Sequence, residues 1–105
     1  MGIENIEKMI MRSLIDLIKI LDIKNDGPIE PSTALFGPRG ILKSMELVSL
    51  IVDIEEKIQE EHGLSLVLAD ERAMSQENSP FRSVSSLAQY IWTLMDETRQ
   101  KESRS

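Results

Sequence analysis

Residues 44–62 read SMELVSLIVDIEEKIQEEH and carry the clearest helical pattern in this 105-residue chain. Apolar residues recur there at three- and four-residue steps, which is the spacing of one face of an α-helix. The inward-facing residues of this pattern are Leu47, Ile51, Ile54 and Ile58. Gly63 follows, and glycine often ends a helix because it adopts a left-handed backbone without strain. We therefore predict a helix that begins at Ser44 and ends near His62.

A second group of apolar residues lies on another side of this helix. It consists of Met45, Val48 and Val52, which we call the apolar strip, and Glu55 and Glu56 lie close by. A strip with a carboxylate edge can pack under a loop, or it can form a surface that binds a partner. The helix alone does not distinguish these two uses.

Two further long helices are predicted, one on each side of the first. Between residues 3 and 21 the apolar residues again follow the helical period. They are Ile3, Ile6, Ile10, Leu14, Leu17 and Leu21. A third pattern begins after Ser83, and serine is a common N-terminal cap of helices. Its inward-facing residues are Val84, Leu87, Ile91, Leu94 and Met95.

The segments between these helices differ in character. Residues 22–43 form a long loop with three prolines, and loops of this length in small domains are usually functional or pinned. The residues expected to pin it are Leu35, Phe36, Ile41 and Leu42. Residues 64–68 are apolar at alternate positions, which indicates an extended connector. Residues 70–74 are expected to form a short helix with Asp70 as its cap.

Together these patterns predict an all-α fold, a small bundle of three main helices and one short helix. Residues 1–105 are expected to form a single domain with its core at about 3–96. The polar residues 97–105 are expected to be a frayed tail.

The charge of the chain is concentrated on one helix. The net charge is −6, and residues 44–61 hold six carboxylates against Lys57 alone, a local net of −5. Such a face is either a solvated surface or a docking surface that attracts basic partners. Nucleic acid is a poor partner for it, because its phosphates would be repelled.

Three further features of the sequence bear on the cellular location of the protein. Cysteine is absent, and no apolar run approaches the roughly 20 residues that span a bilayer. The start of the chain lacks the basic-then-apolar order of a signal peptide. These features favour a cytoplasmic protein without membrane insertion, and a monomer is the default expectation.

Catalytic and metal-binding patterns are weak. Residues 22–33 resemble a calcium loop but place Lys24 and Thr33 where ligands are required, so we reject it. No cluster of His, Asp and Glu has the spacing of metal ligands. Ser44 and His62, the only histidine, lie at opposite ends of one helix, roughly 27 Å apart, too far for proton transfer. An enzyme is therefore not expected.

The region before and after Ser44 resembles the attachment region of acyl and peptidyl carrier proteins. The similar segments are Ala34-Leu35-Phe36-Gly37, Gly40-Ile41-Leu42, Ser44-Met45, Leu47-Val48 and Leu50-Ile51. Residues 67–71 and 81–91 look like the third helix and the opening of the last helix of that family. The similarity covers about residues 30–95. One position departs from the family pattern, since Lys43 stands where the family has aspartate.

The resemblance implies a four-helix carrier with a covalent cofactor. A phosphopantetheinyl transferase would move 4′-phosphopantetheine from coenzyme A to Ser44. The thiol of that arm would hold an acyl or aminoacyl group as a thioester, supplied by a ligase and presented to processing enzymes with basic patches. The residues implied to contact such partners are Lys43, Met45, Glu46, Val48, Val52, Glu55 and Glu56. The carrier itself would catalyse nothing.

Lys43 leaves several interpretations of this site open. The chain can be a variant carrier with an adapted transferase, a poorly modified carrier, or a relative that kept the fold and lost the arm. Lys43 can also be an engineered change. The alternative function is an unmodified helical module that binds basic partners through its acidic helix. The cargo remains open among fatty acid, polyketide, peptide and D-alanyl systems.

Overall fold

The computed structural model describes residues 2–25, 27–37, 39–68 and 80–104, with side chains described up to residue 100. This part of the chain forms three helices, α1 (Ile3–Leu21), α2 (Ser44–His62) and α4 (Val84–Arg104). Within the described residues no strand is formed apart from one isolated bridge between Ala34 and Ser83. The all-helical class predicted from the sequence is therefore confirmed. The short helix predicted at 70–74 lies outside the described residues.

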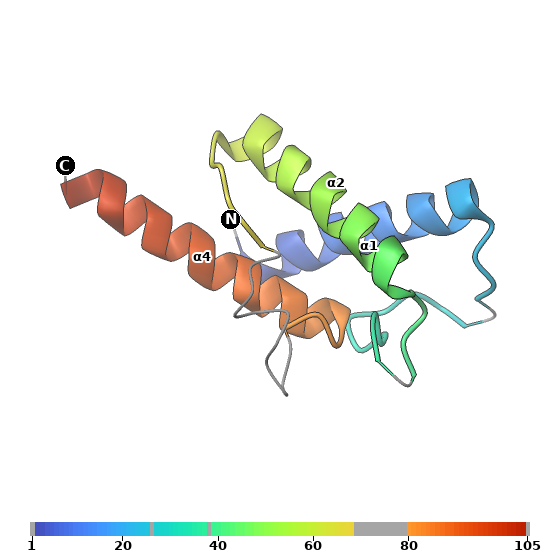
Figure 1. The fold of residues 1–105 in the computed structure, drawn as a ribbon. Helices are drawn as coiled ribbons and strands as arrows, with labels where there is room; N and C mark the ends of the chain where they lie inside the picture. The colour runs from blue at the N-terminus through green and yellow to red at the C-terminus, as the bar shows by residue number, and fades with distance from the viewer. Residues whose placement is uncertain (1, 26, 38, 69–79, 105) are drawn as a thin grey trace.

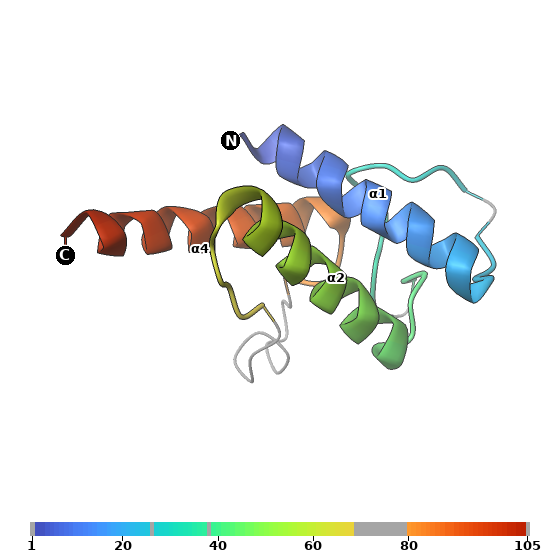
Figure 2. The same ribbon diagram turned by 90° about the horizontal axis from the view of Figure 1, so that it is seen from above.

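The three helices meet at α1. Helix α1 packs against both α2 and α4, and Figures 1 and 2 show α1 and α2 running in opposite directions beside each other. The apolar faces of the helices join in one core, in which Ile10, Ile54 and Ile91 are fully buried. Burial of such faces supplies most of the stability of short helices, because isolated helices are marginal in water.

Helix α1 follows the predicted pattern over most of its length. Ile6, Ile10 and Leu14 are fully buried. Leu21, which the pattern places inward, is 47% exposed instead. It is the last helical residue, and Asp22 then takes a left-handed conformation that ends α1. The end of the helix thus lies beyond the part of α1 that packs against its neighbours.

The long loop 22–43 is pinned to the start of α4 by backbone hydrogen bonds. The Leu35 N–H donates to the Arg82 carbonyl at 2.8 Å, and the Val84 N–H donates to the Thr33 carbonyl at 3.1 Å. The Leu42 N–H donates back to the Leu35 carbonyl at 2.9 Å. Leu35 and Leu42 are buried, as predicted, whereas Phe36 and Ile41 are half-buried. These contacts fix the segment that leads into α2.

A tight turn before α2 requires glycine at position 40. A Cβ atom there would lie 2.5 to 2.6 Å from backbone atoms of Phe36. The Gly40 N–H donates to the Gly37 carbonyl at 3.0 Å, and the Ile41 N–H donates to the Ala34 carbonyl at 3.2 Å. The missing side chain of Gly40 therefore lets the two arms of the turn approach each other.

The connector after α2 is extended, as its alternating pattern predicts. Leu64, Leu66 and Leu68 are buried, whereas Ser65 and Val67 are exposed. Gly63 has a φ of 65°, the left-handed conformation expected of a residue that ends a helix.

Helix α4 begins as predicted after Ser83. The Ser86 N–H donates to the Ser83 Oγ at 3.2 Å, and the Ser83 N–H donates to the Ser86 Oγ at 3.0 Å. This reciprocal pair is the arrangement of a capping box, with serine in place of the usual glutamate. The helix continues through Arg104 and so includes most of the stretch expected to be a tail. Its C-terminal half extends beyond α1 and α2 (Figure 1).

Candidate functional site

Ser44 is the first residue of α2, and its side chain is exposed. Lys43 before it is the N-cap, with an extended backbone of φ −83° and ψ 169°. Leu42, two residues before Ser44, is buried and fixes the entry into the helix. The Ser44 hydroxyl is thus held at a defined position on the surface, at the N-terminal end of α2.

The first turn of α2 is only partly capped. The Lys43 N–H donates to the Glu46 Oε1 at 2.8 Å, and the Leu47 N–H donates to the Lys43 carbonyl at 2.9 Å. The side chain of Lys43 has no acceptor atom, so it cannot bond the free N–H groups of the first turn. Helix N-termini carry a partial positive charge, which favours an anion near Ser44.

The apolar strip is exposed on the surface of α2. Met45 is 79% exposed, Val48 41% and Val52 47%. None of the described loops covers these three residues, so the strip does not serve to pack a described part of the chain. Lys43 and Glu56 are also exposed. Residues 43, 44, 45, 48, 52 and 56 therefore lie on the surface of one helix and its N-cap.

Glu46 and Glu55, the other two residues predicted to contact partners, have intramolecular roles. Glu46 bonds the N-cap backbone. Glu55 Oε1 accepts a hydrogen bond from the Leu68 N–H at 2.8 Å, and its side chain is half-buried. Neither hydrogen bond was predicted from the sequence. The bond between Leu68 and Glu55 joins residues that are 13 positions apart. We therefore assign both glutamates a structural role in addition to any contact with a partner.

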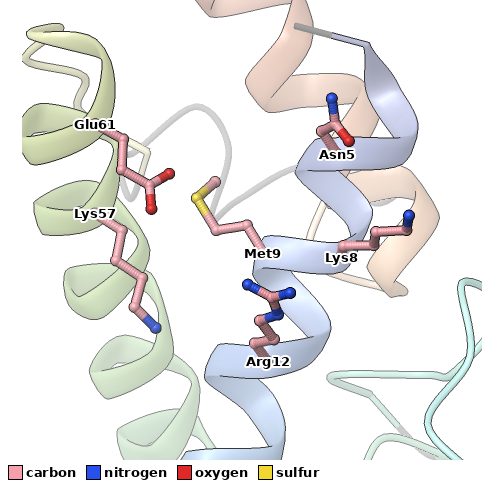
Figure 3. A pocket seen from close by; sticks show the side chains of 6 residues that line it. All are labelled: Asn5, Lys8, Met9, Arg12, Lys57 and Glu61. Carbon is pink, nitrogen blue, oxygen red and sulfur yellow. The ribbon is translucent and has the colours of Figure 1, made fainter.

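A groove between α1 and α2 lies at the other end of α2, far from Ser44. It has a volume of about 280 Å³ and is lined by Asn5, Lys8, Met9, Arg12, Lys57 and Glu61. Figure 3 shows that Glu61 points across the gap toward Met9. Asn5, Lys8, Met9 and Arg12 come from α1, and Lys57 and Glu61 come from α2. Lys57 lies 13 residues after Ser44, roughly 20 Å along the helix, so this groove is separate from the serine.

Within the described part of the chain, no group of three or more His, Cys, Asp and Glu side chains is placed to hold a metal ion. None of the described helices contains an apolar stretch of the length that a membrane span requires. His62 is the last residue of α2, at the opposite end from Ser44.

No family model, curated protein or solved structure matches this chain. The resemblance to carrier proteins therefore rests on the sequence pattern over about residues 30–95 alone. The sequence located Ser44 at the start of α2, and the helical period located the strip, because the period determines which residues share a side of a helix. It did not indicate the bond of Glu55 or the spaces between α1 and α2, because these depend on contacts between distant segments.

Proposed function

We propose that this protein is a four-helix carrier that holds an acyl or aminoacyl group on 4′-phosphopantetheine attached to Ser44. In this proposal the short helix expected at 70–74 is the third helix of the bundle. The observation that carries the proposal is the exposed Ser44 at the first position of α2, followed on the same helix by the exposed apolar strip.

The residues around Ser44 fit a phosphodiester. A phosphate ester on the Ser44 Oγ would lie at the positive end of α2, beside N–H groups of the first turn. Lys43 is exposed next to it and adds a cation where the carrier family has aspartate. When bound, the prosthetic arm supplies a thiol that forms the thioester with the cargo. In the attachment step the Ser44 Oγ forms a bond to phosphorus, its proton leaves, and the nucleotide half of coenzyme A departs.

The surface after Ser44 fits the recognition of partner enzymes. The apolar strip offers side chains that a partner can bury, and Glu56 with the other carboxylates of α2 attracts basic surfaces. Electrostatic attraction mainly raises the rate of encounter, whereas apolar contacts at the centre of an interface carry more of the affinity. The proposed partners are a phosphopantetheinyl transferase, a ligase that activates the cargo, and enzymes that process it.

Incubation with coenzyme A and a broad-specificity phosphopantetheinyl transferase tests this proposal. Intact-mass measurement is expected to show a gain of one phosphopantetheine. The gain is expected to disappear in Ser44→Ala and to remain in Ser85→Ala, a control at an exposed serine of α4. If the mass gain appears only in Lys43→Asp, the natural transferase is one that recognises a lysine before Ser44. If neither the wild type nor Lys43→Asp gains mass, attachment at Ser44 is refuted.

Lys43 supports a second candidate function, an unmodified module that binds basic partners through α2. Lys43 reverses the charge of the family's aspartate beside Ser44, which usually weakens the binding of a basic transferase at that point. The carboxylates farther along α2 are unaffected and can still attract other basic partners. This candidate predicts that a partner recovered by its affinity for the chain binds Ser44→Ala as tightly as the wild type. Binding that requires the phosphopantetheine arm would exclude it.

A further inference from the structure

A second hollow lies between the C-terminal half of α1 and the N-terminal half of α2. Its volume is about 340 Å³. Its apolar wall is formed by Leu17, Ile20 and Leu50. Leu50 is fully buried, whereas Ile20 is 77% exposed and is one of the most exposed apolar residues of the described chain. We call this space the Asp16 hollow, because Asp16 and Asp53 also line it.

Among the described residues, Asp16 in this hollow has no ion-pair partner. The Lys57 Nζ lies 3.0 Å from the Asp53 Oδ2 and donates a hydrogen bond to the Ser13 Oγ at 2.6 Å. The lysine therefore already has two partners. Asp16 forms no ion pair with any described residue, and the lining carries one more negative than positive charge. An exposed apolar wall beside an unpaired carboxylate is suited to a side chain that is apolar along its length and cationic at its end.

We propose that the Asp16 hollow receives an arginine side chain of a partner protein. The three methylenes of arginine would lie along Leu17 and Ile20, above the buried Leu50, and the guanidinium would reach Asp16 and the free oxygen of Asp53. Arginine suits this place better than lysine, because its planar head bonds carboxylates in pairs and is more weakly hydrated. Only the identity of the partner rests on the proposed function: if the chain is a carrier, the partner is an enzyme that acts on it.

The hollow and the apolar strip lie on neighbouring sides of α2. Successive residues of a helix are rotated by about 100°, so Ser49 and Asp53, which line the hollow, lie next to Met45 and Val52 around the helix axis. One partner surface can therefore cover the strip and place an arginine in the hollow. Such a second anchor point would fix how the partner is oriented relative to Ser44.

The first test is a titration of the isotope-labelled protein with N-acetylarginine methylamide, followed by NMR. Amide signals of residues that line the hollow, among them Ser49 and Asp53, are expected to shift, and the shifts are expected to fall at least twofold in Asp16→Asn. Asp96→Asn on α4 removes a carboxylate outside the hollow and serves as the control. The citrulline analogue has the same shape without the charge, and equal shifts with it would overturn the proposal. Shifts spread evenly over the surface would also overturn it.

The second test measures kcat/KM for modification by the transferase. Asp16→Asn and Ile20→Ser are each expected to lower it roughly two- to fivefold, since an exposed contact contributes only modestly to binding. Ile15→Ser is the control for Ile20→Ser, because Ile15 lies on the opposite side of α1. Wild-type rates for both hollow variants would contradict the proposal. If neither the wild type nor Lys43→Asp is modified, the proposed function is refuted instead. The arginine titration, which needs no transferase, then still tests whether the hollow binds arginine.

Discussion

Lys43 is a residue type that is unfavourable at its position, the N-cap of α2. It occupies the N-cap of α2 with an extended backbone, a place where Asp, Asn, Ser and Thr are preferred because their side chains accept a backbone hydrogen bond. Lysine has no acceptor, and its positive charge lies at the positive end of the helix. The residue thus lowers the stability of the first turn while placing a cation beside Ser44.

Lys43→Asp is expected to raise the free energy of unfolding by about 1 kcal/mol, because aspartate both caps the helix and opposes its partial charge. Urea denaturation followed by circular dichroism measures the change. Lys43→Ala removes the cation without adding a cap, and we expect it to have a smaller effect. Equal stabilities of the aspartate and alanine variants would show that capping contributes nothing at this position.

At the scale of single elements, α2 combines two roles. It carries the exposed strip, and Glu55 beside the strip holds the extended connector through the hydrogen bond from the Leu68 N–H. The period of the helix predicts the strip and the buried seam correctly, since both depend only on which residues share a side. The bond of Glu55 depends on where the chain returns after Gly63, which the period does not describe.

Glu55→Ala is expected to lower the free energy of unfolding by about 1–3 kcal/mol, because it leaves the partly buried Leu68 N–H without its partner. Chemical denaturation measures the loss. Glu56→Ala is the matched control, since Glu56 is the next residue and is exposed without a structural bond in the described chain. A loss of the same size in both variants would mean that helix propensity or charge, rather than the bond to the connector, explains the effect.

At the scale of the whole molecule, α1 is joined to α2 by a polar contact in addition to the apolar core. The Lys57 Nζ is bonded to the Ser13 Oγ, and Ser13 is only 1% exposed. This contact links residues 44 positions apart. Lys57 lines both the groove near Glu61 and the Asp16 hollow, so the contact lies between these two cavities. It therefore fixes the relative position of the two helices that form the Asp16 hollow.

Lys57→Met is expected to cost about 1–3 kcal/mol of unfolding free energy, because the buried Ser13 hydroxyl loses its partner. In a double-mutant cycle with Ser13→Ala, the two changes are expected to be coupled by about 1 kcal/mol. Lys19→Met replaces an exposed lysine of α1 and controls for the loss of charge. Strictly additive effects of the two substitutions would indicate that the contact does not join the helices.

The sequence by itself determined the helical class, the bounds of α2, the caps at Ser83 and Gly63, and the apolar strip that follows Ser44. These follow from local period and backbone preference, which act between residues a few positions apart. Only the tertiary structure decided that Leu21 is exposed, that Glu55 bonds Leu68, and that Asp16 lines a hollow opposite α2. The physical reason is that these features depend on contacts between separate segments: where α1 stops packing against its neighbours, where the chain returns after Gly63, and where α1 and α2 cross. A one-dimensional pattern does not contain that information.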